Sequence, residues 1–224
     1  EVLFRYRSPI LRAVVISQIL IYTLVLASLI VSFALPSWVR RILEVSLLFL
    51  LSIPLSLLLW DRLRLMGLIL SLILILLGLK YTKPLPLIGV IALCTAISIS
   101  SDVLGGSWLM RYSPLGYDPV GGARFYGIGN EYMGVLIGSA IMGWAVLVEY
   151  TSLRRKQKAF GVLFFTALVV VIGYPSLGTN VGGAIAAVFA FGSTWFTFNG
   201  KKNSWRTGII LSMIVILVLG LFMV

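Results

Sequence analysis

Polar and charged side chains gather in one stretch of this sequence, residues 101–134, which lies between two apolar segments. The stretch reads SDVLGGSWLMRYSPLGYDPVGGARFYGIGNEYMG, and its three acids are Asp102, Asp118 and Glu131. Two carboxylates that meet can act as general acid and base, or can hold Mg²⁺ or Ca²⁺ against a phosphate group. The spacing of these acids matches no metal-binding motif. We therefore predict no bound metal or cofactor and treat the three acids as candidate catalytic residues.

The residue types that are missing exclude several kinds of chemistry. Histidine is absent, which removes the commonest general base and the usual transition-metal ligand. Cys94 is the only cysteine, and because it lies in an apolar run we expect it to be a small core residue. Any reaction must use carboxylates, Arg, Lys, Tyr, backbone amides or a hard cation, and whether the chain is an enzyme stays open.

Two glycine-rich elements each run into a predicted helix. The first contains Gly127, Gly129, Asn130 and Glu131, and the second, PSLGTNVGG at 175–183, contains Thr179, Asn180, Gly182 and Gly183. A glycine-rich turn at a helix start exposes backbone N–H groups and the positive end of the helix dipole, which together bind anions. Interrupted helices in transporters place such starts around a shared ligand. We therefore predict that the two elements meet and form one ligand-binding site.

The same residues also have a purely structural interpretation. Asn130 can cap the helix that follows it, and Arg124 can pair with Glu131 or Asp118. The glycines at 182–183 can simply allow two helices to approach each other closely. Both interpretations stay open from the residues alone.

Aromatic side chains flank the two arginines of this stretch, Arg111 and Arg124. They are Tyr112, Tyr117, Phe125 and Tyr126. Such residues commonly form the belt at the membrane–water interface. They also suit a pocket for a sugar or an isoprenoid-phosphate headgroup, in which rings stack and arginines bind phosphate through two hydrogen bonds. Arg111, Arg124 and Tyr126 are therefore candidate ligand-binding residues.

The composition is that of a membrane protein. Of the 224 residues, 60% are hydrophobic and 11% are charged, whereas soluble domains carry about 25% charged residues. Several uncharged apolar stretches, such as that between Arg12 and Arg40, exceed the roughly 18 to 20 residues of a membrane-spanning helix. The net charge of +11 comes from small clusters at the ends of apolar runs, which favours contact with anionic lipid headgroups and argues against nucleic acid as a partner.

We predict an all-α fold, a polytopic transmembrane bundle of about eight spans in a single domain, residues 1–224. The four spans within residues 1–100 cover 13–35, 42–60, 65–79 and 85–100, of which the third is short for a full crossing. Residues 101–131 form a glycine-rich extracytoplasmic loop or re-entrant segment before span five. Four further spans lie within 132–224, at 132–147, twice within 159–200 around a turn at 175–180, and at 208–224. The chain ends within an apolar run, so we expect it to be a domain of a longer protein.

The basic residues predict the orientation of the chain. Loops 150–159 and 199–207 are rich in Lys and Arg, whereas the turn at 175–180 has neither. The positive-inside rule places both loops in the cytoplasm and segments 101–125 and 175–180 outside it. With eight spans the amino terminus also lies outside, against the preference of Arg5, Arg7 and Arg12 for the cytoplasm.

The motif GGARFYGIGNEYMG, with YSPLGYDP before it and GTNVGG after it, resembles a family of uncharacterised bacterial multi-pass membrane proteins. The shared pattern is an Arg-Phe-x-Gly-x-Gly-Asn element followed by a second glycine-rich element, and it covers about residues 100–190. The resemblance implies a location in the cytoplasmic (inner) membrane of a bacterium and no particular activity. It implies that one functional unit is formed by Arg124, Phe125, Gly127, Gly129, Asn130, Asn180, Gly182 and Gly183.

Three functions agree with these features. We favour a transporter or flippase-like module that binds an anionic solute or a lipid phosphate, such as a polyprenyl phosphate, on the outer side. A second interpretation is a cell-envelope enzyme that acts on a lipid-linked substrate, with Glu131 or Asp102 as base and Arg124 stabilising phosphate charge. A third is a membrane anchor or assembly domain for a soluble domain outside this chain. Membrane lipids are expected partners in each case.

Overall fold

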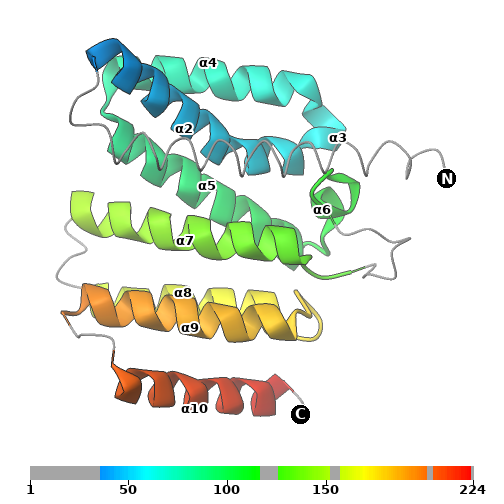
Figure 1. Cartoon of the computed structure of the whole chain (residues 1–224). Coiled ribbons are helices and arrows are strands. Elements are labelled where there is room, and N and C mark those ends of the chain that lie inside the picture. The colour runs from blue at the N-terminus through cyan, green and yellow to red at the C-terminus, as the bar shows by residue number, and fades with distance from the viewer. Residues whose placement is uncertain (1–35, 117–125, 152–156, 201–203, 223–224) are drawn as a thin grey trace.

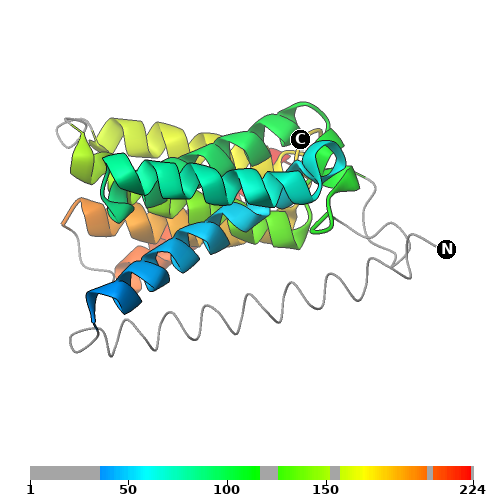
Figure 2. The ribbon, with the colours of Figure 1, turned by 90° about the horizontal axis from the view of Figure 1, so that it is seen from above.

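The computed structural model describes residues 36–116, 126–151, 157–200 and 204–222, and each regular element in these ranges is an α-helix. The helices are α2 (Ser37–Leu58), α3 (Trp60–Leu63), α4 (Leu65–Tyr81), α5 (Pro84–Leu104), α6 (Trp108–Tyr112), α7 (Asn130–Tyr150), α8 (Gln157–Gly173), α9 (Val181–Phe198) and α10 (Trp205–Phe222). The long helices lie side by side and successive ones run in opposite directions (Figure 1). A second view shows that they also stack in depth (Figure 2).

Among the described residues, five helices are long and apolar enough to cross a membrane, namely α2, α5, α7, α9 and α10. The apolar helices α4 and α8 are shorter. Each has 17 residues, which corresponds to about 25 Å and falls short of a hydrocarbon core about 30 Å thick. The all-α prediction is confirmed for the described residues, and a count of eight spans stays a prediction.

The predicted spans from the second to the eighth each correspond to one described helix, and the first, 13–35, lies outside the described residues. The segment predicted as an outer loop, 101–131, is partly helical. Helix α5 continues to Leu104 before Gly105 ends it, and the short helix α6 follows. Helix α2 also continues through Pro54.

The two ends of the bundle differ in character. The starts of α2, α5, α8 and α10 and the ends of α4, α7 and α9 lie at one end, which we call the basic end (Figure 1). Its exposed basic side chains include Arg41, Lys80, Lys83, Lys158 and Arg206. Helix α6, the starts of α7 and α9 and the turn between α8 and α9 lie at the opposite end, which we call the glycine-rich end.

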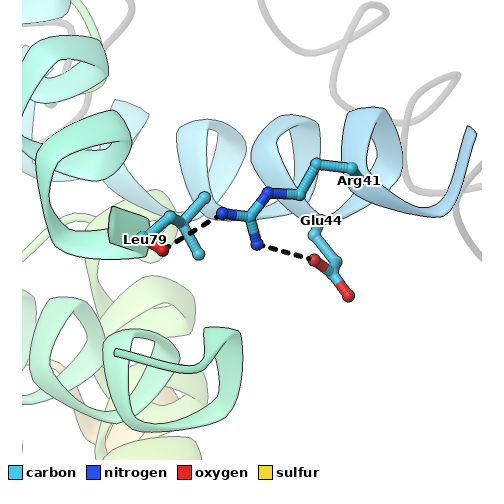
Figure 3. Close-up of polar contacts among 3 residues, drawn as sticks. All are labelled: Arg41, Glu44 and Leu79. Carbon is cyan, nitrogen blue, oxygen red and sulfur yellow. Dashed lines mark hydrogen bonds and ion pairs between the residues drawn. The ribbon is translucent and has the colours of Figure 1, made fainter. Parts of the chain in front are cut away.

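An arginine joins α2 to α4 at the basic end. Arg41 donates one hydrogen bond from Nη2 to the carbonyl oxygen of Leu79 at 3.1 Å and pairs through Nη1 with Oε2 of Glu44 at 3.4 Å (Figure 3). Leu79 lies in the last turn of α4, where carbonyl groups have no partner within the helix. The guanidinium therefore satisfies an acceptor that the end of α4 leaves open.

Among the described helices, α5 and α7 share the most extensive contact. A Cβ built on Gly89 would lie 2.4 Å from Cγ1 of Val146, and one built on Gly143 would lie 2.7 Å from Cγ of Leu93. Neither glycine could therefore carry a side chain at this separation. Tyr132, Leu136 and other buried side chains of α7 continue the contact into the core. Small residues at a helix crossing allow this close packing in a membrane, where van der Waals contact drives association.

We expect Gly143→Ala to destabilise the protein by about 1 to 3 kcal/mol, the usual range for overpacking. The added methyl group would lie 3.1 Å from the backbone nitrogen of Leu93, so α5 itself would have to move. Thermal unfolding of the purified protein in detergent measures the effect.

Gly138→Ala on the same helix is the matched control, because a Cβ there meets nothing within 4 Å. Replacing this helical glycine should leave the melting temperature unchanged or raise it, by up to about 1 kcal/mol of stability. Equal melting temperatures for the two variants would contradict the packing argument.

Cys94 does not occupy the core position that the sequence predicts. Its side chain is exposed on α5. Exposed apolar side chains such as Ile97 lie on the same helix, which is the expected surface of a helix in contact with lipid.

Candidate functional site

The two glycine-rich elements meet at the glycine-rich end of the bundle. The backbone N–H of Ile128, just before α7, donates to the carbonyl oxygen of Gly178 at 2.8 Å. The carbonyl oxygen of Ile128 accepts a hydrogen bond from Nδ2 of Asn180 at 3.1 Å. Ile128 is fully buried, so both of its backbone polar groups depend on the second element. The predicted meeting of the two elements is confirmed.

Asn180 is the centre of this contact. Its side chain is 3% exposed and makes three hydrogen bonds. Its Oδ1 accepts from the backbone N–H of Gly183 at 2.8 Å, which caps the start of α9. Its Nδ2 donates to the carbonyl oxygen of Ile128 and also to Oδ1 of Asn130 at 3.1 Å. The buried amide therefore connects the starts of α7 and α9.

These bonds determine how Asn130 presents its own side chain. A backbone N–H can only donate a hydrogen bond, so the atom of Asn180 that faces Gly183 must be the amide oxygen. A carbonyl oxygen can only accept, so the atom that faces Ile128 must be the amide nitrogen. Asn180 must then donate to Asn130, and Asn130 must offer its oxygen. The Nδ2 of the exposed Asn130 is then not used in the contact with Asn180. Among the described residues, none accepts a hydrogen bond from it.

Asn130 is not the helix cap that one interpretation of the sequence makes it. The residue at the N-cap position of α7 is Gly129, which has no side chain to cap with, and Asn130 is the first residue of the helix. Asn180 fills the capping role at α9 instead. The first backbone N–H groups of α7 have no acceptor within their own helix, as at any helix start.

Two glycines allow the elements to approach this closely. Gly127 has φ +78°, and a Cβ on it would lie 2.3 Å from the carbonyl oxygen of Gly178. A Cβ on Gly178 would lie 2.3 Å from the carbonyl oxygen of Ile172 at the end of α8. Gly178 was not among the predicted site residues, although the sequence GTNVGG contains it.

The other predicted residues of the second element have structural roles or open surroundings. A Cβ on Gly183 would lie 2.7 Å from Cγ of Met133, so this glycine permits close packing of α9 on α7. Gly182 is exposed. Thr179 has φ +51° and donates from Oγ1 to the carbonyl oxygen of Pro175 at 2.8 Å, which holds the turn between α8 and α9.

The candidate acids do not form one group in the described residues. Asp102 is buried near the end of α5, and its two carboxylate oxygens accept from the backbone N–H groups of Leu109 at 2.8 Å and Met110 at 2.9 Å. It therefore caps the short helix α6. Glu131 is exposed in the first turn of α7. Asp118 lies outside the described residues, as do Arg124 and Phe125.

A buried tyrosine supports the start of α7 and was not predicted from sequence. Tyr132 is fully buried, and its Oη lies 2.5 Å from Oγ of Ser113 and 3.4 Å from the carbonyl oxygen of Pro54, to which it donates. The backbone N–H of Leu115 donates to Oγ of Ser113 at 3.2 Å. This chain of polar contacts joins α7 to α2 and to the segment after α6. A tyrosine two residues into an apolar helix is a weak signal, because it is equally common at the membrane interface.

Helix α6 presents an exposed aromatic and basic surface at the same end. The guanidinium of Arg111 lies 5.4 Å from the ring centroid of Trp108, and that ring stacks on Tyr112 at a centroid distance of 6.1 Å. Tyr126 is also exposed. This arrangement is typical of the membrane–water interface and also suits contact with a polar headgroup.

These features define an all-helical protein in which five of the described helices are long and apolar enough to cross a membrane, with two helix starts joined by an asparagine pair at one end. Comparisons of the chain with protein-family models, with curated proteins and with solved structures find no match.

Proposed function

We propose that this chain is a transporter or flippase-like membrane module that binds an anionic solute or a lipid phosphate at the start of α7. The observation that carries the proposal is the orientation of Asn130. Its oxygen is occupied by Asn180, so its Nδ2 is a fixed donor beside the first N–H groups of α7. Fixed donors at a helix start bind anions because they need no reorganisation and add to the helix dipole.

The distribution of charge supports an outward-facing position for this site. The basic end carries the exposed side chains of Arg41, Lys80, Lys83, Lys158 and Arg206. We infer that the basic end faces the cytoplasm of a bacterium and the glycine-rich end faces outward, as the positive-inside rule requires. An anion that binds beside Asn130 would then come from the outer leaflet or from outside the cell.

We assign opposing roles to the two charged residues next to this site. Arg124 precedes α7 by a few residues and is proposed to bind the anion through its guanidinium. Glu131 is exposed in the first turn of α7 and carries the same sign of charge as the ligand. Its proposed effect is to weaken binding in the resting state, which favours release of the ligand.

The test uses proteoliposomes that contain a fluorescent phosphatidylglycerol, with radiolabelled inorganic phosphate as the probe for a soluble anion. If the proposal is right, the protein moves one of the two probes across the bilayer. Asn130→Ala and Arg124→Ala then slow this movement by about 10- to 100-fold, the effect of losing one hydrogen bond to a charged group. Lys83→Ala, at the opposite end of the bundle, keeps the rate.

Glu131→Gln separates this function from catalysis on a lipid-linked substrate. A transporter should bind the anion more tightly when Glu131 loses its charge, whereas an enzyme that uses Glu131 as base should lose turnover. Movement of neither probe above that in empty liposomes, or rates equal to those of the wild type in both Asn130→Ala and Arg124→Ala, would overturn the proposal.

A further inference from the structure

A cavity of about 270 Å³ lies between α8, α9 and α10, away from the asparagine pair. Helix α9 forms its floor with Val188, Phe191 and Gly192. Phe165 of α8 and Leu211 of α10 line opposite walls. Figure 1 shows α9 in front of α8, with α10 beside α9, so that α8 and α10 flank the helix that forms the floor. Thr166 and Ile214 line the cavity and are also exposed, so the cavity opens on the surface of the bundle.

The apolar lining and the length of this groove suit a hydrocarbon chain. Along α8 the lining runs from Gly161 to Val169, a length of about 12 Å at 1.5 Å per residue. This length is close to the depth of one leaflet, which is about half of a 30 Å hydrocarbon core.

One end of the groove lies near basic residues at the basic end of the bundle. Trp195 lines the groove, and its Nε1 donates to the carbonyl oxygen of Lys158 at 3.1 Å. The side chain of Lys158 is exposed there, and so is that of Arg206 in the first turn of α10. Tryptophan at the end of an apolar groove, next to lysine and arginine, is the arrangement expected where a lipid headgroup meets the acyl region.

From these observations we infer that the groove is a binding site for one anionic phospholipid of the basic-end leaflet. One acyl chain lies along α9 between α8 and α10, and the phosphate headgroup lies near Lys158 and Arg206. This site is independent of the anion site at Asn130, which lies at the opposite end of the bundle.

The test compares retained lipid in the full chain, with phosphatidylglycerol as the probe and phosphatidylcholine as its neutral counterpart. Protein exchanged into each lipid and then into detergent is examined by native mass spectrometry. A phosphatidylglycerol that carries a diazirine in its acyl chain is crosslinked in parallel. The expected result is one retained phosphatidylglycerol per chain, with crosslinks that map to residues lining the groove.

Thr166→Trp should fill the mouth of the groove and reduce the retained phosphatidylglycerol at least fivefold. Leu163→Trp is the matched control, because Leu163 is exposed on the same helix and does not line the groove. Size-exclusion profiles and melting temperatures show whether both variants fold. Equal lipid retention in the two folded variants would overturn the inference.

The charge contribution is measured without filling the groove. Lys158→Gln with Arg206→Gln should weaken the preference for phosphatidylglycerol over phosphatidylcholine by about fivefold for each basic side chain at low salt. Lys80→Gln with Lys83→Gln, at the same end but away from the groove, should leave that preference unchanged. Equal retention of both lipids by the wild-type protein would overturn the inference. A wild-type dimer that is lost in Thr166→Trp would also overturn it, because the occupant of the groove would then be a second copy of the chain.

Discussion

Asn180→Ala is expected to lower the free energy of unfolding by about 3 kcal/mol. Loss of the cap on α9 accounts for about 1 kcal/mol. The buried carbonyl of Ile128 loses a donor that no water replaces, which costs a further 1 to 3 kcal/mol or so. For a chain of this size the sum corresponds to a fall of roughly 6 to 12 °C in the melting temperature in detergent. The same change frees the side chain of Asn130 to rotate, so binding of the anion should fall as well.

Two further variants separate the contributions of this amide. Asn130→Ala removes one of the three bonds of Asn180 and leaves the cap and the bond to Ile128, so we expect a loss of no more than about 1 kcal/mol. Asn180→Asp keeps an acceptor for Gly183 but turns a second oxygen toward the oxygens of Ile128 and Asn130, so it should destabilise the protein at least as much as alanine does. The structural role is wrong if Asn180→Ala melts no lower than Asn130→Ala.

The positions of the helices could be predicted because charged residues and prolines interrupt the apolar runs. The run at 65–79 was predicted to be short, and α4 is among the two shorter apolar helices. Which side chains of a helix face the core and which face lipid was harder to predict. A helix that is apolar on all sides has no stripe that distinguishes core from lipid, so nothing in the sequence around Cys94 shows that it faces outward.

The meeting of the two glycine-rich elements could be predicted because both precede helices that run in the same direction. The roles of the individual residues could not be predicted, because each role depends on contacts between residues far apart in the chain. Asn130 and Asn180 both stand between a glycine-containing turn and an apolar run in the sequence, yet the structure makes Asn180 the cap of α9 and Asn130 the residue that it orients. Asp102 caps α6 only because Gly105 and Gly106 return the chain to the end of α5, and no spacing rule for acids describes that turn.

We expect Gly127→Ala to be strongly destabilising, because it strains the backbone and forces apart the two glycine-rich elements. Gly127 has φ +78°, which costs an alanine about 1 kcal/mol or more, and the new Cβ would lie 2.3 Å from the carbonyl oxygen of Gly178. The atom that it meets belongs to the backbone of the turn before α9, so the two elements would have to separate. That separation would also break the bond from Ile128 to Gly178 and the bond from Asn180 to Ile128. The total loss should be about 3 to 5 kcal/mol.

Gly106→Ala is the matched control for this change. Gly106 also has a positive φ, +92°, but a Cβ there meets nothing within 4 Å, so only the backbone cost of about 1 kcal/mol remains. Thermal unfolding in detergent compares the two variants, and hydrogen exchange at the N–H of Ile128 reports the broken contact directly. If the two variants melt at the same temperature, or if Gly127→Ala leaves exchange at Ile128 slow, then the close approach of Gly127 to Gly178 does not hold the starts of α7 and α9 together.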